Sequence, residues 1–342
     1  MVSSKVLSVA VAGVLLAVGH SASAALVPVG IFNGNVAVSI DGIGSNSNPV
    51  GSVQAMVPAG STILAAYLYS AGTPYPWYSD SPRTLADYNT AGISLAGTPV
   101  NNFTALVGAI STRADIGQWF TARADVTSLV QSLVAAGAGP DYAWSVEEGT
   151  KNTRIDGEVL AIVYSNPSLP VGSVALLDGG QNTGGETTNV ALGAPLGDPT
   201  AAGFAAMMSI ASTFSCCGQA STISVNGAEL TRFAGNFDDG LVASDGSLIT
   251  VGGIDDDPSN NVASYDDDDE LYDLRSFLAL GDTSFSIFTQ NETNDDNIFF
   301  MGLYLTGDIR DINPTPTPEP GSLALLGLGL AGLGLTRRRQ KG

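Results

Sequence analysis

Histidine is almost absent from this sequence of 342 residues, and the single one, His20, lies in an apolar N-terminal segment. The remainder of the chain therefore cannot form a Ser-His-Asp or Cys-His catalytic site, and it has no imidazole to bind zinc or iron. Lysine is nearly as rare, because Lys151 is the only one between residues 25 and 313, and no motif of a Ser-Lys enzyme surrounds it. Carboxylate chemistry and metal binding through oxygen ligands remain open.

Positive charge of any kind is scarce. The chain has 13 lysine and arginine residues against 33 aspartate and glutamate residues, a net charge of −20. Five of the basic residues and one of the acidic residues lie in residues 1–24 and 314–342, so residues 25–313 carry 8 basic and 32 acidic residues and a net charge of −24. A body this acidic repels the phosphates of DNA and RNA, which excludes nucleic acid as a partner, and it attracts divalent cations.

Cysteine occurs only as the adjacent pair Cys216 and Cys217. Neighbouring Cα atoms lie about 3.8 Å apart across a trans peptide, which is closer than the usual disulfide range of about 4.4–6.8 Å. A bond between the two cysteines would be strained and would force an unusual turn, which the following Gly218 suits. We expect a vicinal disulfide; two free buried thiols, an intermolecular link or a redox role are the alternatives.

The N-terminus has the organisation of a secretory signal peptide. A lysine precedes an apolar run over residues 6–18, and the small residues Ala22 and Ala24 then precede Ala25. This order predicts that residues 1–24 are a signal peptide, which signal peptidase removes between Ala24 and Ala25. An uncleaved N-terminal anchor is the alternative. Export would place the cysteine pair in an oxidising compartment, which favours the disulfide.

The C-terminus carries a short polar motif, an apolar run and a basic end, in this order. Residues 321–336 contain no charged side chain, and the apolar residues 321–335 would span roughly 22 Å as a helix, somewhat less than a hydrocarbon core of about 30 Å. Flanking residues or local thinning of the bilayer would absorb the difference. The basic tail, residues 337–342, favours a cytoplasmic C-terminus and an exported body. The motif is Pro318, Glu319 and Pro320, and the basic stop is Arg337, Arg338 and Arg339.

This order resembles the PEP-CTERM sorting tail of proteins from Gram-negative bacteria. The resemblance implies that a membrane-embedded exosortase recognises Pro318, Glu319 and Pro320 and that the helix is then removed. The tail would thus be a transient anchor in the inner membrane, and the body would end at the cell surface or in the extracellular matrix. A buried core helix is the alternative, which the arginines at the end of the run disfavour.

The body, residues 25–312, reads as short strands separated by turn residues. Asn226-Gly227 has the sequence of a two-residue hairpin turn, and Ala96-Gly97 is a second tight turn. The stretch 158–164 is almost wholly apolar, which predicts a strand buried on both faces. The predicted strands cover residues 35–41, 61–69, 93–95, 158–164, 174–177, 222–225, 248–251, 283–289 and 298–306.

Helices are few. One is predicted over residues 126–135, with Asp125 as its cap and Gly137 as its end, and a short one over residues 272–280. Many short strands with few helices predict an all-β fold, an antiparallel β-sandwich or jelly roll built as one large domain or two abutting ones. Alternating proline and threonine over residues 313–320 predict an extended spacer between the body and the membrane helix.

Three stretches of the body resemble secreted bacterial and archaeal β-sandwich domains of uncharacterised function. They are residues 120–127 (FTARADVT), residues 157–164 (GEVLAIVY) and Asp178-Gly179. The resemblance covers about residues 61–180, and it implies a β-sandwich fold. It implies no catalytic residue.

The densest negative charge lies between residues 238 and 311, with 18 of the 32 acidic residues of the body. Adjacent carboxylates repel one another unless water or a cation separates them, and calcium binds six to eight oxygen ligands of this kind. Ca2+ is therefore the one cofactor that the sequence suggests, although Asn260 stands where an EF-hand has glycine. A solvated acidic loop without a metal is the alternative. The candidate ligands are Asp255, Asp257, Asp266, Asp268, Asp295 and Asp296.

These features predict a non-enzymatic protein of the cell envelope or extracellular matrix, structural or adhesive and associated with exopolysaccharide. A calcium-dependent carbohydrate-binding or adhesion module is the first alternative. For it, Tyr67, Tyr69, Tyr75, Trp77 and Tyr78 would stack on sugar rings, whereas ordinary packing is the other interpretation of these aromatic residues. A carbohydrate-active hydrolase is the second alternative, although no two of the many carboxylates stand out as a catalytic pair.

Overall fold

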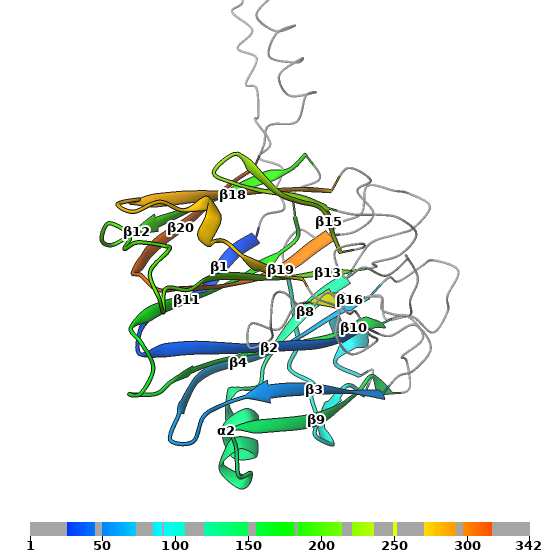
Figure 1. Cartoon of the computed structure of the whole chain (residues 1–342). Helices are drawn as coiled ribbons and strands as arrows, with labels where there is room; N and C mark the ends of the chain where they lie inside the picture. The colour runs from blue at the N-terminus through cyan, green and yellow to red at the C-terminus, as the bar shows by residue number, and fades with distance from the viewer. Residues whose placement is uncertain are drawn as a thin grey trace, which may run out of the picture.

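The described residues form four antiparallel β-sheets that stack face to face (Figure 1). The predicted all-β, sandwich-like fold is thus confirmed, with four layers in place of the two of a simple sandwich. This computed structural model describes residues 26–44, 50–72, 85–90, 92–106, 120–149, 155–181, 184–213, 221–235, 249–251, 270–291 and 297–316.

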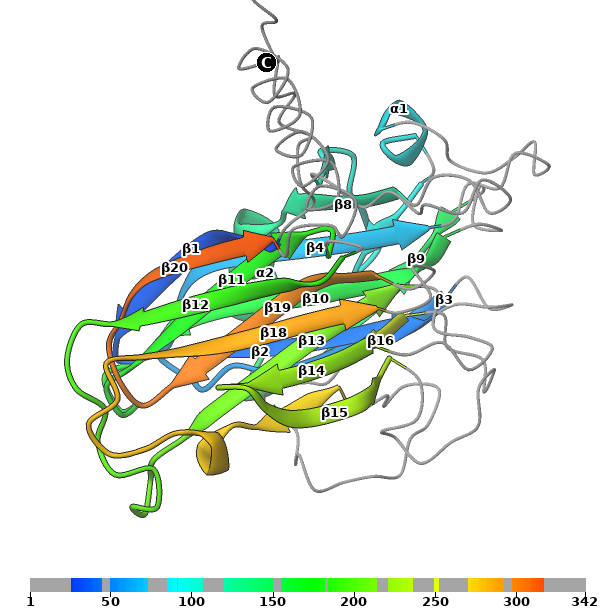
Figure 2. The same cartoon turned by 90° about the horizontal axis from the view of Figure 1, so that it is seen from above.

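We number the sheets I to IV from the top of Figure 1 to the bottom. Sheet I, whose strands Figure 2 shows side by side, consists in spatial order of β15 (Ala228–Ala234), β14 (Ser221–Val225), β18 (Ser284–Asn291), β12 (Glu186–Leu192) and β20 (Ile309–Pro316). Sheet II consists of β1 (Leu26–Gly34), β11 (Gly172–Gly179), β19 (Asn297–Leu305), β13 (Ala206–Thr213) and β16 (Ile249–Val251), with β17 (Leu271–Asp273) also paired to β13.

The lower two sheets come mostly from the first half of the chain. Sheet III consists of β2 (Val36–Gly44), β10 (Ile155–Ser165), β4 (Thr62–Gly72), β8 (Phe120–Asp125) and β7 (Thr104–Ala105). Sheet IV consists of β3 (Val50–Met56), β9 (Asp141–Glu147), β5 (Ser94–Leu95) and β6 (Thr98–Pro99).

Three hydrophobic cores fill the spaces between the four sheets. Ile287 and Leu303 belong to the core between sheets I and II, and Phe300 belongs to the core between sheets II and III. Val130 and Trp144 belong to the third core, between sheet III, sheet IV and the helix α2 (Thr127–Ala136). Sheets II and III are therefore buried on both faces, which is why their strands are the most apolar in the chain.

Strand β10 confirms the prediction of a strand buried on both faces. Val159 and Val163 pack in the core between sheets II and III, whereas Leu160 and Ile162 pack in the core between sheets III and IV. This alternation follows from the two-residue period of a strand. Burying each of these side chains contributes about 1.5–3 kcal/mol, so β10 is a main source of the stability of the lower half.

Both predicted tight turns are present. Asn226 and Gly227 have φ angles of 51° and 78° and connect β14 to β15. Ala96 and Gly97 have φ angles of 49° and 72° and connect β5 to β6. Positive φ at both central residues is what a type I′ hairpin turn requires, and asparagine and glycine adopt it at little cost.

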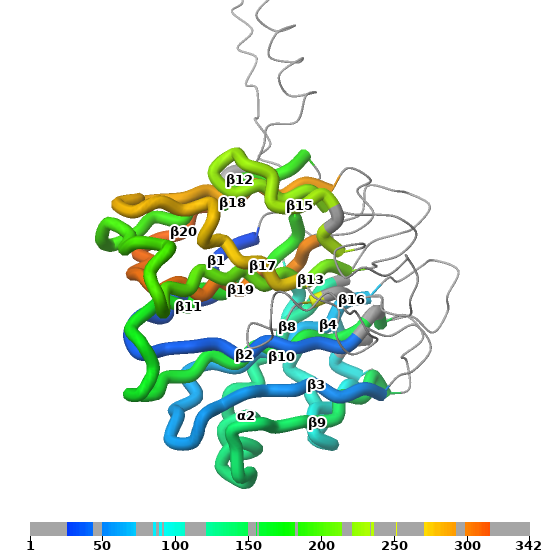
Figure 3. The backbone as a smooth tube through the Cα atoms, viewed as in Figure 1, coloured from blue at the N-terminus to red at the C-terminus, as the bar shows by residue number. Residues whose placement is uncertain are grey.

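Helix α2 begins and ends one residue later than predicted. The N–H of Val126 donates to the carbonyl of Ala66 at 2.9 Å, which extends the pairing of β8 with β4 by one residue and delays the helix. The carboxylate of Asp125 instead accepts the N–H of Thr127 at 2.9 Å. Gly137 ends the helix as predicted, and its N–H donates to the carbonyl of Leu133 at 3.2 Å. Figure 3 shows α2 beside β9 at the bottom of the stack.

The second predicted helix, over residues 272–280, is much shorter in the structure. Residues Leu271–Asp273 form strand β17, and only Arg275–Phe277 form a single 3-10 turn. Tyr272 belongs to the strand because β17 pairs with β13 at this point. A further short helix, α1 (Leu85–Tyr88), was not predicted.

The last described strand, β20, includes residues that the sequence assigns to the spacer. Thr315 lies opposite Thr187, and Pro314 lies opposite Thr188, in the pairing of β20 with β12. Strand β20 is at the edge of sheet I. Proline has no backbone N–H, and an edge strand tolerates this because one side of its backbone does not pair with another strand. The body therefore continues to Pro316, and the spacer predicted over residues 313–320 is shorter by its first four residues.

Candidate functional site

The residues that the sequence singles out for processing, metal binding and disulfide formation lie outside the described part of the chain, and their roles stay predictions. Among the residues that the structure describes, no group of three or more Asp, Glu, His or Cys side chains is placed to hold a metal ion. The residues outside are Ala22, Ala24, Ala25, Cys216, Cys217, Asp255, Asp257, Asp266, Asp268, Asp295, Asp296, Pro318, Glu319, Pro320, Arg337, Arg338 and Arg339.

The two ends of the described chain meet at one buried carboxylate, Glu186. Leu26 begins strand β1, and its N–H donates to Oε1 of Glu186 at 3.1 Å. Pro316 ends strand β20 and lies directly opposite Glu186 in the pairing of β20 with β12. The chain thus enters and leaves the folded body at one corner, which we call the Glu186 corner (Leu26, Glu186, Thr289 and Pro316).

The strand pattern of β12 explains why Glu186 is inside. Glu186, Val190 and Leu192 are buried because alternate residues of β12 face sheet II. Thr289 lies directly opposite Glu186 on the neighbouring strand β18, so its side chain lies on the same face. Thr289 is 1% exposed, and its hydroxyl has no hydrogen-bond partner in the described part of the protein.

A second charged site is an ion pair that connects sheet III to sheet II. The guanidinium of Arg123 on β8 forms an ion pair and a hydrogen bond with the carboxylate of Asp178 on β11. Arg123 also lies 5.1 Å from the ring centre of Tyr67. Tyr69 is fully buried beside this group, and its ring centre lies 4.9 Å from that of Phe300. Tyr69 is therefore a core residue, as the packing interpretation of the aromatic residues expects.

Burial controls the protonation of this group. Burial raises the pKa of Asp178 more than the neighbouring Arg123 guanidinium lowers it. Burial also raises the pKa of Tyr69 well above its ordinary value, and the Asp178 carboxylate adds to that rise. For Arg123, burial lowers the pKa, but Asp178, Tyr69 and Tyr67 together raise it by more, so the guanidinium stays charged. The two opposite charges thus form an ion pair without net charge that connects sheet III to sheet II.

Other buried carboxylates accept hydrogen bonds from their own surroundings. The hydroxyl of Ser70 donates to Oε1 of Glu158 at 3.1 Å. Glu270 accepts the backbone N–H of Gly235 and the hydroxyl of Tyr272. Such bonds offset the cost of removing a carboxylate from water, so these side chains have a structural explanation.

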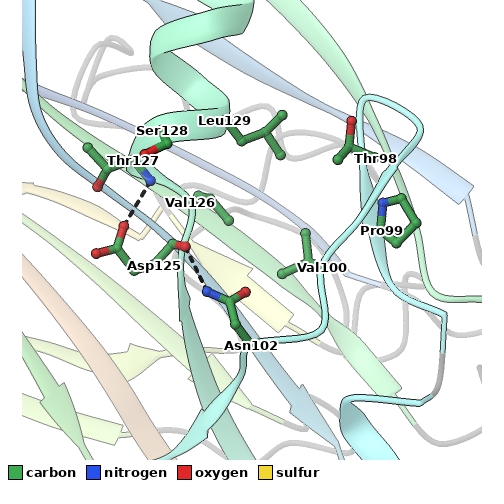
Figure 4. A pocket seen from close by; sticks show the side chains of 9 residues that line it. All are labelled: Thr98, Pro99, Val100, Asn102, Asp125, Val126, Thr127, Ser128 and Leu129. Atoms are coloured by element: carbon green, nitrogen blue, oxygen red, sulfur yellow. Dashed lines mark hydrogen bonds between the residues drawn. The ribbon is translucent and has the colours of Figure 1, made fainter.

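An open pocket of about 490 Å³ lies at the N-terminus of α2 (Figure 4). Its polar groups bind one another: Asp125 accepts the N–H of Thr127, and the side chain of Asn102 donates to the carbonyl of Asp125 at 2.9 Å. Glycoside hydrolysis needs two carboxylates about 5–9.5 Å apart, and Asp125 is the single carboxylate among the residues that line this pocket. They are Thr98, Pro99, Val100, Asn102, Asp125, Val126, Thr127, Ser128 and Leu129.

Neither Glu186 nor the Arg123–Asp178 pair was recognised from the sequence as a site. Their partners lie 160 and 55 residues away along the chain, so no local spacing indicates them. One signal was present, because Arg123 lies in β8 between two alanines that are buried. A charged residue in such a strand predicts a buried partner of opposite sign.

Comparison with curated proteins finds no match. Among solved structures, the chain is similar to a BuGH86 variant crystallised in complex with neoagarooctaose, at 10% identity and a TM-score of 0.16, over 80% of this chain and 33% of that one. The chain thus spans about a third of that protein's length, and a likeness this weak carries no argument about function.

The remaining comparison concerns the C-terminus. Among the described residues, no helix is both long and apolar enough to cross a membrane, and the apolar run 321–335 lies beyond them. The model of the PEP-CTERM protein-sorting motif matches residues 316–339, from the last residue of β20 into the basic tail. The chain therefore carries, directly after its folded body, the PEP-CTERM sorting motif that exosortase recognises in exported proteins.

Proposed function

We propose that this protein is a non-enzymatic component of the cell envelope or extracellular matrix of a Gram-negative bacterium. On this proposal, a signal peptide directs export, exosortase processes the tail at Pro318, Glu319 and Pro320, and the released body associates with exopolysaccharide. The observation that carries the proposal is the match of the sorting motif to residues 316–339. The four-layer body supports a structural role, because its described buried carboxylates and its Arg123–Asp178 pair hold strands and sheets together.

On this proposal, the short segment after β20 limits how far the body stands from the membrane before processing. Strand β20 ends at Pro316, and four residues lie between it and the apolar run that begins at residue 321. Four extended residues span at most about 14 Å. Exosortase would therefore act close to the Glu186 corner, with the folded body held against the membrane surface.

The acidic body suggests how it associates with polysaccharide. A net charge of −24 over residues 25–313 attracts divalent cations, and such cations also bind the carboxylates of acidic polysaccharides. Cation bridging would thus connect body and matrix without a dedicated sugar pocket. The open pocket of Figure 4, with one carboxylate, is consistent with this role.

Processing is tested by fractionation of the native host and mass spectrometry. The wild-type protein should appear outside the cell without any peptide from residues 323–342, whereas Glu319→Ala should keep the tail and remain with the inner membrane. Thr315→Ala, which changes β20 outside the Pro-Glu-Pro motif, is the matched control and should be processed normally. An intact C-terminus on the extracellular wild-type protein would refute the proposed processing.

Association with polysaccharide is tested separately. The protein should sediment with the matrix of a host that makes exopolysaccharide, and it should appear in the soluble medium of a host that makes none. A chelator should release it from the matrix. Equal distribution in the two hosts would refute the association while leaving the sorting proposal intact, and turnover of the polysaccharide by the purified protein would refute the non-enzymatic role.

A further inference from the structure

The outer face of sheet I carries no charged side chain on its three middle strands. Figure 2 looks onto this face and shows β14, β18 and β12 side by side. Alternate residues of each strand point outward, and the outward positions of these strands hold serine, threonine, asparagine, glutamine, alanine and one phenylalanine, Phe288. We call these outward residues the uncharged face, which contrasts with the net charge of −24 over residues 25–313.

The charged groups nearest to the uncharged face lie on the two edge strands of sheet I. Glu229 on β15 lies opposite Ser224 of β14, and its carboxylate pairs with Arg232. Asp311 on β20 lies opposite Ala191 of β12, and its carboxylate accepts the backbone N–H of the next residue and the side-chain amide of the residue after that. Both edge carboxylates therefore already have partners within their own strand.

Phe288 lies at the centre of the uncharged face and is partly exposed. Thr187 of β12 lies directly opposite it on one side, and Ser224 of β14 lies directly opposite it on the other. Gly185 precedes Thr187 by two residues, and a Cβ at Gly185 would lie 2.9 Å from Cζ of Phe288. The ring thus leans over the backbone at Gly185, where the absence of a side chain gives it room, and it is held against the surface of the sheet.

Uncharged polar side chains surround the ring. Ser286 and Gln290 lie two residues from Phe288 on its own strand and share its face. The side chains of Thr187, Ser224 and Gln290 form no hydrogen bond with any residue that the structure describes, and hydroxyl and amide groups both donate and accept hydrogen bonds. A sugar ring has an apolar C–H face and a rim of hydroxyl groups, so it is complementary to an aromatic ring with such neighbours.

We propose that the uncharged face binds a polysaccharide chain directly, with Phe288 stacked on a sugar ring and with Thr187 and Ser224 hydrogen-bonded to its hydroxyl groups. The inference rests on the proposed association with exopolysaccharide, and it adds a contact that needs no cation. An acidic polysaccharide is repelled by the acidic parts of the body unless cations bridge the two. On the uncharged face this repulsion is weakest, so sugar rings can approach the protein.

The dimensions of the face suit a chain better than a single sugar. Strand β18 has eight residues, which corresponds to roughly 27 Å of extended strand. Outward serine and glutamine side chains continue along β18 on both sides of Phe288. The site would therefore bind several consecutive sugar rings, with Phe288 under a ring in the middle of the bound stretch.

The test measures binding of the purified exported protein to exopolysaccharide isolated from the native host. Affinity electrophoresis with EDTA in the gel removes cation bridges and leaves the direct contact. Wild type should bind, and Phe288→Ala should weaken binding at least about tenfold, as expected for an aromatic anchor at the centre of an interface. Phe288→Trp should bind at least as tightly as wild type. Leu280→Ala, at an apolar position outside the face that is 72% exposed, is the matched control and should bind like wild type.

Two further measurements do not depend on truncation of the aromatic ring. Thr187→Val removes one hydroxyl group with little change of shape and should weaken binding about threefold. Thr98→Val, at an exposed position of β6 in sheet IV, is its control and should have no effect. The tryptophan emission of Phe288→Trp should change when the polysaccharide is added, by more than the emission of wild type does.

The outcomes separate the direct contact from the proposed association itself. Equal binding of wild type, Phe288→Ala and Thr187→Val in EDTA would refute the direct contact, and so would binding that requires calcium; either result leaves association through cations intact. Absence of binding both with calcium and with EDTA would refute the proposed association and the inference with it. A dimer of the protein alone that Phe288→Ala abolishes, measured by analytical ultracentrifugation, would assign the face to a second copy of the chain and overturn the inference.

Discussion

Replacing Arg123 with methionine should destabilise the body strongly, because it leaves the Asp178 carboxylate between sheets II and III without its cation. The Asp178 side chain is 6% exposed and that of Arg123 is 27% exposed. Loss of one partner of a buried ion pair costs about 3–5 kcal/mol, and the partial exposure of Arg123 places the expected cost near 3 kcal/mol. At roughly 2–4 °C per kcal/mol for a large domain, the melting temperature should fall by about 6–12 °C.

The pH dependence of this deficit provides a sharper test. Burial already raises the pKa of Asp178 in the folded state, and loss of Arg123, which lowers that pKa, raises it further. A carboxyl group with a raised folded-state pKa binds its proton more tightly when folded. Its contribution to stability is therefore fully present below the unfolded pKa, near about 4, and is lost as the pH rises through the folded-state pKa. The difference in free energy of unfolding between wild type and Arg123→Met should be largest at neutral pH and should become smaller toward pH ~4.

The assay is calorimetry of wild type and variants over this pH range. Arg232→Met is the control, because Arg232 pairs with Glu229 at the surface, with exposures of 64% and 47%; an exposed pair contributes about 0–1 kcal/mol. Combining Arg123→Met with Asp178→Leu should recover part of the lost stability, since no charge then remains buried. An Arg123→Met variant that melts within about 2 °C of wild type, or with a deficit independent of pH, would refute this account of the pair.

Three further predictions concern the segments that border the described body. Cys216 and Cys217 should form a disulfide with each other, so alkylation of the unreduced, unfolded protein should label no thiol; two labelled thiols or a reducible dimer would contradict this. Millimolar calcium should raise the melting temperature by several degrees more than a sodium salt of equal ionic strength, since a ligand at one hundred times its dissociation constant contributes about 2.7 kcal/mol. Asp255→Asn with Asp257→Asn should remove part of that gain, and equal shifts in the two salts would favour a solvated acidic loop. A chain that ends at residue 312 should have a free energy of unfolding about 1–3 kcal/mol lower than a chain that ends at residue 316, because it lacks the last pairs of β20 with β12. Urea denaturation measures this difference, and equal transition midpoints would contradict the assignment of these residues to the body.

Several strands of the inner sheets could be predicted from the sequence, whereas β1, β8 and β13 of these sheets and several outer strands could not. Strand β10 is recognisable because burial on both faces requires a continuous apolar run. Strands β3 and β9 belong to sheet IV, where only one face is buried, and most of their exposed positions hold serine, glutamine, alanine, aspartate or glutamate. These residues have little β-propensity, so the period-two signal is weak and neither strand was predicted.

The end of the body shows how pairing overrides local composition. Prolines at 314 and 316 indicate a spacer, and the backbone there is extended as that interpretation requires. What the composition cannot show is that β12 lies beside this segment and accepts it as an edge strand. The same limit applies to Glu186, since its contact with Leu26 joins residues 160 positions apart. Only the folded topology brings these groups together.

The position of β20 has a consequence for the order of events during export. Ile309 and Ile312 of β20 complete the core between sheets I and II, and their strand ends only two residues before Pro318. In a chain that crosses the membrane N-terminus first, this core cannot close until almost the whole body has emerged, and the sorting motif emerges immediately afterwards. Completion of the fold and exposure of the motif would thus be nearly simultaneous, so the sorting enzyme would meet the motif at about the time when the body is fully folded.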